Sequence, residues 1–288
     1  MIAAERLQLI SERLRTEHVV SITRLSKLLG VSEMTVRRDL IQLEKMGLCR
    51  RTRGGAVNVR RMLVHDTPYN EREILHVAEK VAIGRAAAEL VQEGETIAID
   101  AGTTTAQMAA ALRNRKNITV ITNSLRVLNQ LCDSPDITVI STGGTICPTS
   151  SRGLAHGDPF LIGPLAEMTL RRFRPSKAFM GTTGLTITDG LSNSVLEQAE
   201  LKRIMIEVSA DVILLIDHSK FGHVASSIVG PITMVNQIIT DSGISPQMKR
   251  ALEEMGIKVT VVEPATDLPL LMSTRTPTQT NSYRGDVE

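Results

Sequence analysis

Three stripes of apolar side chains recur at helical spacing near the start of the chain, separated by polar and charged positions. The stripes are Leu7, Ile10 and Leu14, then Leu25, Leu28 and Leu29, and then Val36, Leu40 and Leu43. Between the first two stripes, Val19 and Val20 predict a short extended segment, and Ser21 is placed to cap the helix that follows. The pattern predicts three short helices that share one core.

The connection between the second and third helices is a tight turn. Gly30 can take the positive φ that stops a helix, and Ser32 can accept a backbone N–H bond at the start of the next helix. Thr35, Arg37 and Arg38 fall off the apolar stripe of the third helix, so they are free to reach outward. Outward polar and cationic side chains after such a turn are typical of a helix that enters the major groove of DNA.

A basic hairpin follows the third helix. Gly47 is expected to end that helix, and residues 49–56 predict a strand, a basic turn and a second strand. A hairpin of this kind beside a helix-turn-helix can reach the DNA backbone or the minor groove. The order of these segments predicts a winged helix-turn-helix DNA-binding domain over residues 1–57.

The motifs VSEMTVRRDL (31–40) and LEKMGLCRRTRGGA (43–56) resemble the amino-terminal domain of the DeoR family of bacterial transcriptional regulators. The family hallmark is a Ser/Thr-rich recognition helix that ends in Arg-Arg-Asp-Leu. One departure is Arg53, because the family often has His before the paired glycines. The residues expected to contact double-stranded operator DNA are Ser21, Thr23, Ser32, Glu33, Met34, Thr35, Arg37, Arg38, Arg50, Arg51 and Arg53.

The distribution of charge agrees with a DNA-binding head. Residues 1–61 hold 13 Lys and Arg against 6 Asp and Glu, whereas residues 62–288 hold 20 against 25. A domain that neutralises phosphates gains affinity by releasing counterions. The alternative is a winged helix that contacts protein and leaves Arg37 and Arg38 solvated.

Length and composition narrow the class of protein. The 288 residues, 42% of them hydrophobic, suffice for a small domain and a second one of typical size. No apolar run approaches the ~20 residues that span a bilayer, and the charged start is unlike a signal peptide, so a cytoplasmic protein without membrane contact is expected. Cys49, Cys132 and Cys147 lack metal-ligand spacing and are expected to be reduced thiols. The six histidines form no ligand pair, with His218 the one singled out, so neither a metal nor a cofactor is predicted.

Beyond residue 72 the pattern changes to short apolar runs that alternate with helical segments. A helix is predicted over residues 73–92, and the apolar runs lie at 96–100, 118–122, 137–142, 178–181, 212–217 and 238–241. Short runs rich in Val and Ile between helices favour an open, mostly parallel α/β sheet. We therefore predict a linker at 58–72, an α/β effector-sensing domain at 73–264 and a disordered tail at 265–288.

The segment Asp100–Thr105 is the most specific strand end in this second part. Open α/β sheets bind ligands at the carboxyl ends of their strands. Gly102 lets the backbone approach a ligand, and the threonine hydroxyls and free N–H groups at a helix start can hold anionic oxygens. The expected ligand group is phosphate, with Asp100 accepting bonds from sugar hydroxyls. The alternative is a strand-to-helix turn with threonine caps and a structural aspartate.

Further strand ends carry small, polar or flexible residues, at 122–124, 143–144, 181–184 and 217–222. Together with the cation of Lys220, they predict a pocket for a polar anionic small molecule. For a single member such as Asn123, capping or turn formation is an equal alternative.

These strand-end motifs resemble the sensor domain of the DeoR family, which is similar in fold to ribose-5-phosphate isomerase and glucosamine-6-phosphate deaminase. The resemblance extends to about residue 264 and implies phosphate at 102–105 with help from Lys220, and sugar hydroxyls at Asp100, Asn123 and Gly181. Two departures are Gln198, where many members have Glu, and a longer loop at 149–158, which is either a lid or a plain insertion. The predicted effector-binding residues are Asp100, Gly102, Thr103, Thr104, Thr105, Thr122, Asn123, Ser124, Gly143, Gly144, Gly181, Gln198, Asp217 and Lys220.

The resulting hypothesis is a DNA-binding transcriptional repressor of a carbohydrate or polyol catabolism operon, released from its operator by a phosphorylated sugar and acting as a homo-oligomer, dimer or tetramer. The alternative is a sugar-phosphate isomerase or deaminase-like enzyme with an accessory winged helix. Enzymes of that fold need carboxylates at the strand end occupied here by 179–183, and no acid stands there. Asp189, Glu197 and Glu200 follow only later, so no catalysis is predicted.

Overall fold

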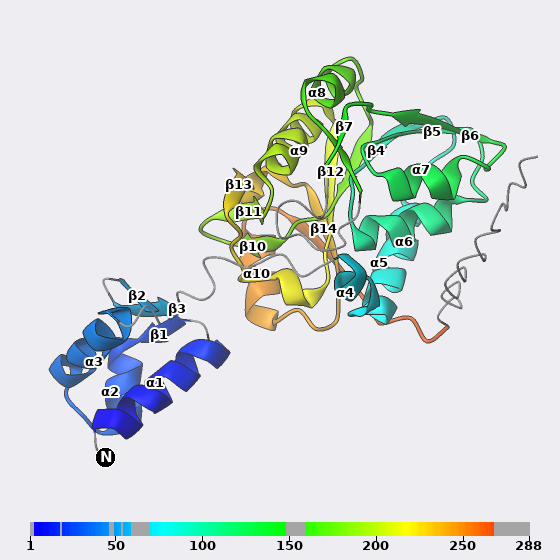
Figure 1. Cartoon of the computed structure of the whole chain (residues 1–288). Coiled ribbons are helices and arrows are strands. Elements are labelled where there is room, and N and C mark those ends of the chain that lie inside the picture. The colour runs from blue at the N-terminus through cyan, green and yellow to red at the C-terminus, as the bar shows by residue number, and fades with distance from the viewer. Residues whose placement is uncertain are drawn as a thin grey trace, which may run out of the picture.

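The computed structural model describes residues 3–17, 19–45, 49–52, 54–58, 69–147 and 159–267 (Figure 1). The amino-terminal part consists of α1 (Ala3–Glu17), α2 (Ile22–Leu29), α3 (Glu33–Lys45), β1 (Val19–Ser21), β2 (Cys49–Thr52) and β3 (Gly55–Asn58). The three strands form an antiparallel sheet in the order β1-β3-β2. This is the predicted winged helix-turn-helix.

The predicted apolar stripes form the core of this part, with one exception. Ile10, Leu14, Leu25, Leu29, Val36, Leu40 and Leu43 are all buried in one cluster. The prediction that Leu28 belongs to the buried stripe of the second helix is wrong, because its side chain is 52% exposed. A helix of only eight residues buries one narrow face, which Ile22, Leu25 and Leu29 fill.

A nearly buried ion pair ties the first helix to the recognition helix. Arg6 Nε and Nη2 donate to the two carboxylate oxygens of Asp39 at 2.6 and 3.0 Å. The side chains of Arg6 and Asp39 are 12% and 6% exposed. Loss of one partner would leave the other charge buried without compensation.

Asp39→Ala is therefore expected to loosen α3. Amide exchange in peptides from 33–45, measured by mass spectrometry, should become faster by about two orders of magnitude. Arg37→Ala is the control, because Arg37 is exposed on the same helix and forms no hydrogen bond or ion pair with another described residue, so its effect should stay within about fivefold. Equal effects of the two substitutions would contradict a special role for the Arg6–Asp39 pair.

The second part is built on a seven-stranded sheet in the order β15-β14-β12-β9-β4-β5-β6, in which every neighbouring pair is parallel. Its strands are β4 (Thr96–Ile99), β5 (Ile118–Thr122), β6 (Ile137–Ser141), β9 (Lys177–Met180), β12 (Asp211–Leu215), β14 (Gln237–Asp241) and β15 (Lys258–Val262). The prediction of an open parallel sheet is confirmed, although β15 was not among the predicted strands. Smaller antiparallel sheets, also unpredicted, join β7 (Thr145–Ile146) to β8 (Leu161–Ile162), and β10 (Gly184–Thr186) to β11 (Gly190–Asn193) and β13 (Ser227–Gly230).

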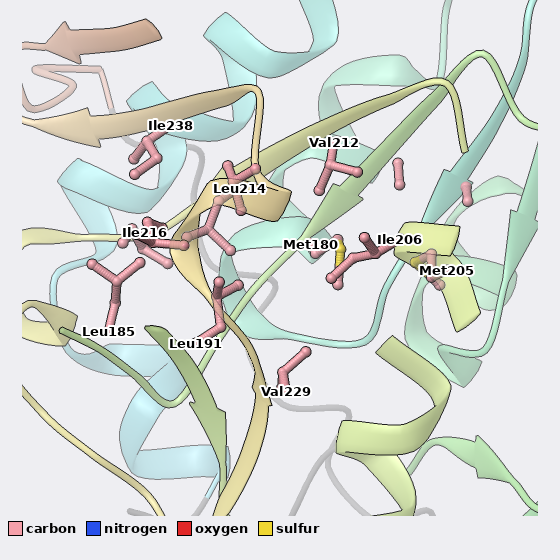
Figure 2. Packing of buried hydrophobic residues seen from close by; sticks show 14 of the residues in the cluster. Met180, Leu185, Leu191, Met205, Ile206, Val212, Leu214, Ile216, Val229 and Ile238 are labelled. Carbon is pink, nitrogen blue, oxygen red and sulfur yellow. The ribbon is translucent and has the colours of Figure 1, made fainter. Parts of the chain in front are cut away.

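Helices cover both faces of the large sheet, because alternate strand residues point to opposite sides. Phe179 and Ile213 belong to the core under α5 (Val77–Glu89), α6 (Thr103–Leu112) and α7 (Leu125–Leu131). Ala178, Met180 and Leu214 belong to the opposite core, which includes residues of α8 (Pro164–Arg171), α9 (Leu196–Val208) and α10 (Pro246–Glu254). Figure 2 shows this second core, to which Met180 and Leu214 of the sheet and Leu191 of β11 all contribute.

The single helix predicted over 73–92 is wrong, because the chain forms two helices there. α4 (Tyr69–Ile74) ends before Leu75, and α5 begins after His76, whose φ of 53° lies in the left-handed region. Tyr69, which was predicted to lie in the linker, is buried, and the Arg126 guanidinium stacks on its ring at 4.6 Å. This contact fixes the start of α4 on the second part of the chain.

Several predicted segments lie wholly or partly outside the described residues. They include 59–68 of the linker, 148–158 of the long loop and 268–288 of the tail. At the start of the predicted tail, the Ala265 N–H donates to Ala78 O at 3.0 Å, and Asp267 pairs with Arg85 at 2.7 Å. None of the described helices combines the length and apolarity needed to cross a membrane.

Candidate nucleic-acid interface and ligand pocket

The turn between α2 and α3 has the geometry that the sequence predicted. Gly30 adopts φ 65° and ends α2 in the left-handed conformation, where a side chain would be strained. Ser32 Oγ accepts the Thr35 N–H at 3.2 Å and caps α3. The turn therefore fixes the angle at which α3 leaves α2.

The outer face of α3 presents cationic and apolar groups to solvent. Arg37 and Arg38 are exposed and form no hydrogen bond or ion pair with another described residue. Met34, one turn earlier, is 62% exposed. These side chains form a free surface that an anionic, grooved partner can contact.

Other residues predicted to contact DNA are engaged within the protein. Thr23 Oγ1 donates to Glu33 Oε1 at 2.8 Å, and Ser21 caps α2. Arg51 donates through its backbone N–H and its Nε to Glu44, both at 2.8 Å, and these bonds lower the pKa of Glu44. They fix the hairpin to α3. Arg50 lies on β2, and Arg53 lies outside the described residues.

The large sheet reverses its strand order between β4 and β9. From β4 the chain continues outward through β5 and β6, whereas β9, β12, β14 and β15 extend the sheet in the opposite direction. A crevice forms at such a switch point because the connections after the two central strands turn to opposite faces. The segments after β4 and β9, at 100–105 and 181–183, therefore lie side by side.

A pocket opens at this point, and we call it the switch pocket. Of the predicted effector residues, it is lined by Gly102, Thr103, Thr104, Thr105, Gly181, Gln198 and Lys220. Thr182 and Thr183, from the predicted strand end 181–184, also line it, whereas three further polar members were not predicted, namely Arg72, Asn193 and Lys202. Their positions depend on α4, α9 and the small β10-β11-β13 sheet, whose place beside the switch point no local pattern reveals.

Asp100 does not line the switch pocket but anchors one of its walls. Its carboxylate is buried and accepts a short hydrogen bond from Lys202 Nζ through Oδ2, which also accepts the Gly181 N–H at 3.3 Å. Lys202 Nζ donates as well to Gly181 O at 2.9 Å. Asp100 Oδ1 is buried without a hydrogen-bond partner in the described structure. The pair ties β4, β9 and α9 together.

Six other predicted residues do not line the switch pocket: Asp217 lines a neighbouring cavity, and the remaining five have roles in turns and caps. Thr122 Oγ1 donates to Ile99 O at 2.6 Å, Asn123 Oδ1 accepts the Ala101 N–H at 3.1 Å, and Ser124 Oγ caps α7. Gly143 and Gly144 take positive φ values in the turn after β6, at the edge of the sheet. Turn and capping roles, the alternative considered for Asn123, account for the observed bonds.

The pocket has the chemistry of an anion site. The first turn of α6 consists of Thr103, Thr104 and Thr105, whose N–H groups precede the first intrahelical bond, from Ala106 to Gly102 O. Lys220 extends to the same pocket, and its ammonium makes no hydrogen bond with another described residue. Backbone donors, the helix dipole and a cation together favour negatively charged oxygens.

Amide groups form another wall of the switch pocket. Asn193 Nδ2 donates to Gln198 Oε1 at 2.5 Å. None of the described residues lining this pocket is an Asp or a Glu. Of the later acids, Asp189 bonds to Thr186 and Thr188, and Glu200 pairs with Arg203, so neither is directed to the pocket.

A second cavity adjoins the switch pocket and shares Arg72, Thr183 and Lys220 with it; we call it the side pocket. Its remaining lining consists of Leu75, His76, Lys80, Asp217, Ser219 and His223. Burial alone would raise the pKa of Asp217. The positive charges of Lys220 and Lys80, together with hydrogen bonds from Ser219, lower it below its ordinary value. Asp217 therefore balances part of the cationic charge.

Lys80 lies on α5 at the base of the side pocket. Its Nζ donates to Arg72 O and, at 2.5 Å, to Leu75 O, and so closes the break between α4 and α5. Burial lowers the pKa of Lys80 to about 8, although Asp217 opposes this effect. The folded protein is therefore less stable when Lys80 is charged than when it is neutral.

This cost predicts a pH dependence of stability. The pKa of Lys80 is about 8 in the folded protein, which lies below its value in the unfolded chain. Above about pH 8 the unfolded chain therefore binds more protons at Lys80 than the folded protein does. The free energy of unfolding consequently increases with pH until Lys80 also deprotonates in the unfolded chain. The difference in unfolding free energy between the wild type and Lys80→Met should therefore grow by roughly 2 kcal/mol between about pH 8 and about pH 9.5. Urea denaturation followed by circular dichroism measures it. A difference independent of pH would contradict the assignment.

Comparison with known proteins relates both parts of the chain to one family. The DeoR-like helix-turn-helix domain matches residues 6–61, and the DeoR C terminal sensor domain matches residues 75–242. The HTH-type transcriptional regulator YulB of Bacillus subtilis is 38% identical over 262 residues, which cover 91% of this chain and 98% of that protein. The transcriptional repressor AccR of Agrobacterium fabrum is 36% identical over 258 residues, which cover 89% of this chain and 96% of that protein.

Among solved structures, ribose 5-phosphate isomerase A from Methanocaldococcus jannaschii aligns with 53% of this chain and 55% of its own. The sequence identity is 18% and the TM-score is 0.36. This likeness is too weak to support any inference about ligand or activity.

Proposed function

Because the chain belongs to the DeoR family of transcriptional regulators, we propose that it represses an operon of carbohydrate or polyol catabolism until a phosphorylated sugar binds its sensor domain. The chain is a regulator rather than an enzyme, since the matched relatives are transcriptional regulators. The observation that carries the proposal is the switch pocket, a carboxylate-free anion site in a chain that also presents an exposed cationic helix.

On the operator, α3 enters the major groove. Arg37 and Arg38 contact phosphates and fix the position of the helix, since guanidinium groups bind phosphate oxygens through several donors. Met34, Thr35 and Glu33 are better placed for base edges, where an exposed Met suits the methyl group of thymine. Specificity then lies mainly in the less charged residues.

In the sensor domain, the effector's phosphate binds the N–H groups of 103–105, the hydroxyls of Thr103 and Thr104, and the ammonium of Lys220. The amide groups of Asn193 and Gln198, which can both donate and accept, bind sugar hydroxyls. Arg72 links this ligand to α4, the first described helix after the DNA-binding part. Binding thereby acts on the segment that leads to the winged helix.

A homo-oligomer presents paired winged helices to two half-sites, and the effector favours an arrangement that cannot span them. Such coupling requires different effector affinities for the two arrangements, typically ~1–3 kcal/mol.

A thermal-shift screen against sugar phosphates, each beside the same sugar without phosphate, tests the ligand class. A ligand that binds only the folded state raises the melting temperature by mass action, with about 4 kcal/mol of stabilisation at a thousandfold excess over Kd. We expect a shift with at least one phosphorylated sugar and none with its unphosphorylated partner. Equal shifts with both would contradict a phosphate site.

A further inference from the structure

We propose that His76, Glu79 and His218 form a binding site for a first-row transition-metal ion such as Zn²⁺ at the rim of the side pocket. Each side chain offers one ligand atom, and these atoms all lie within 4.8 Å of one another. His76 Nδ1 and Glu79 Oε1 are 3.7 Å apart. In a tetrahedral zinc site with bonds of about 2.1 Å, ligand atoms lie about 3.4 Å apart, so small side-chain rotations complete the coordination.

This site cannot be predicted from residue spacing, because the two histidines are far apart along the chain. His76 precedes α5, and His218 lies in the 3₁₀ turn His218–Lys220 after β12. The fold brings their rings into an edge-to-face contact with centroids 4.7 Å apart. The prediction that the histidines form no ligand pair was made from their spacing along the sequence, whereas the fold places His76 and His218 side by side.

A buried carboxylate orients His218 as in known metal sites. Asp241 Oδ2 lies 2.7 Å from His218 Nδ1, and Asp241 Oδ1 accepts the His218 backbone N–H at 2.7 Å. The Asp241 side chain is only 2% exposed. Metal-binding histidines usually donate their second ring N–H to a carboxylate, which fixes the tautomer and the ring. Nε2 is then the nitrogen that His218 offers to the ion.

The backbone of Gly243 packs closely against the imidazole ring of His218. A Cβ at Gly243 would lie 2.5 Å from Cγ and 2.6 Å from Nδ1 of His218, so the ring rests directly against the glycine backbone. The same Gly243 donates its N–H to Asp241 Oδ2 at 2.9 Å. Ring, carboxylate and backbone thus form one rigid unit.

The other two ligands come from the start of α5. His76 holds a left-handed φ of 53°, a conformation that is uncommon outside glycine and costs free energy. Glu79 follows three residues later, on the same side of the helix. The side chains of His76, Glu79 and His218 are 20–34% exposed, so an ion can reach them from solvent.

The donor set selects the type of ion. Two imidazole nitrogens and one carboxylate oxygen suit Zn²⁺ and its neighbours in the first transition row, whereas Mg²⁺ and Ca²⁺ prefer oxygen ligands alone. Three protein ligands leave a coordination position open, and His76 lines the side pocket that Lys220 also lines. Because its ligands come from both segments, the ion clamps the start of α5 to the turn after β12.

The test is a titration of the tag-free, chelator-treated full-length chain with Co²⁺, followed by displacement with Zn²⁺. We expect one Co²⁺ per chain, with visible d–d bands of a nitrogen and oxygen site. Asp241→Asn should weaken binding by about 10- to 100-fold, and His218→Ala and Glu79→Gln at least as much. His223→Ala, which removes a side-pocket histidine outside the cluster, should leave the affinity unchanged.

Glu79→Gln keeps the size and partial exposure of the side chain, so it remains informative if His218→Ala lowers the melting temperature. Failure to bind one ion per chain would overturn the proposal. So would binding that survives both Glu79→Gln and His218→Ala, or thiolate charge-transfer bands that point to the exposed Cys132.

Discussion

Replacement of Arg37 and Arg38 together by alanine is expected to weaken operator binding by about 30-fold at about 0.15 M salt and by about 200-fold at about 0.05 M. Both side chains are exposed on α3 and are not held by a described acidic residue. Loss of two phosphate contacts, at about 1 kcal/mol each, gives the factor at the higher salt, and a salt dependence of log K that is lower by about 2 gives the roughly sevenfold larger factor at the lower salt. Fluorescence anisotropy of a labelled operator at several salt concentrations measures both quantities.

The matched control is Arg113→Ala with Lys116→Ala, which removes the same charge from an exposed loop after α6. It should leave the affinity and the salt slope within about twofold of the wild type, because a contact-free charge acts only through a screened field. If both double variants behaved alike, net charge rather than the recognition helix would account for binding.

Lys220→Ala should raise the effector concentration needed for half-maximal release from the operator by about 10- to 100-fold. A charge-assisted hydrogen bond is worth about 1.5–3 kcal/mol, which corresponds to this range. Operator affinity without effector should not change, since Lys220 lies in the sensor domain between the switch and side pockets. Thr104→Val, which removes one hydroxyl at equal size, should have a smaller effect of the same kind.

Lys258→Ala is the control for this variant. Lys258 is an exposed lysine on β15, the strand at the far edge of the sheet from β6, and lines neither pocket. Effector response should stay normal in Lys258→Ala. An unaltered response in Lys220→Ala would place the phosphate elsewhere.

Local signals in the sequence predicted most of the winged helix and of the large sheet. Gly30 and Ser32 act through their own backbone neighbourhood, so their roles can be predicted without knowledge of the fold. The strand-end segment 102–105 was found for the same reason, because a strand followed by Gly and three threonines specifies a helix start. The break at His76 was missed, since a left-handed histidine between two helices has no local signature.

The site residues that were not predicted from the sequence are positioned by long-range contacts. Lys202 has no distinguishing pattern in the sequence, yet it is buried and bonds to Asp100 and Gly181, the residues that directly follow β4 and β9. Arg72 lies on α4, whose first residue, Tyr69, packs against Arg126, and it lines the switch pocket from there. These residues depend on strand order, which periodicity does not encode.

The most direct test of the central claim is effector-dependent release from DNA. The full-length protein would first select its operator from random duplexes, and the selected duplex would then be titrated by anisotropy with sugar phosphates and with the same sugars without phosphate. The account predicts that one phosphorylated sugar weakens operator binding by about 5- to 150-fold in the wild type, with a blunted response in Lys220→Ala. Failure to select a duplex, or equal release by the unphosphorylated sugar, would contradict it.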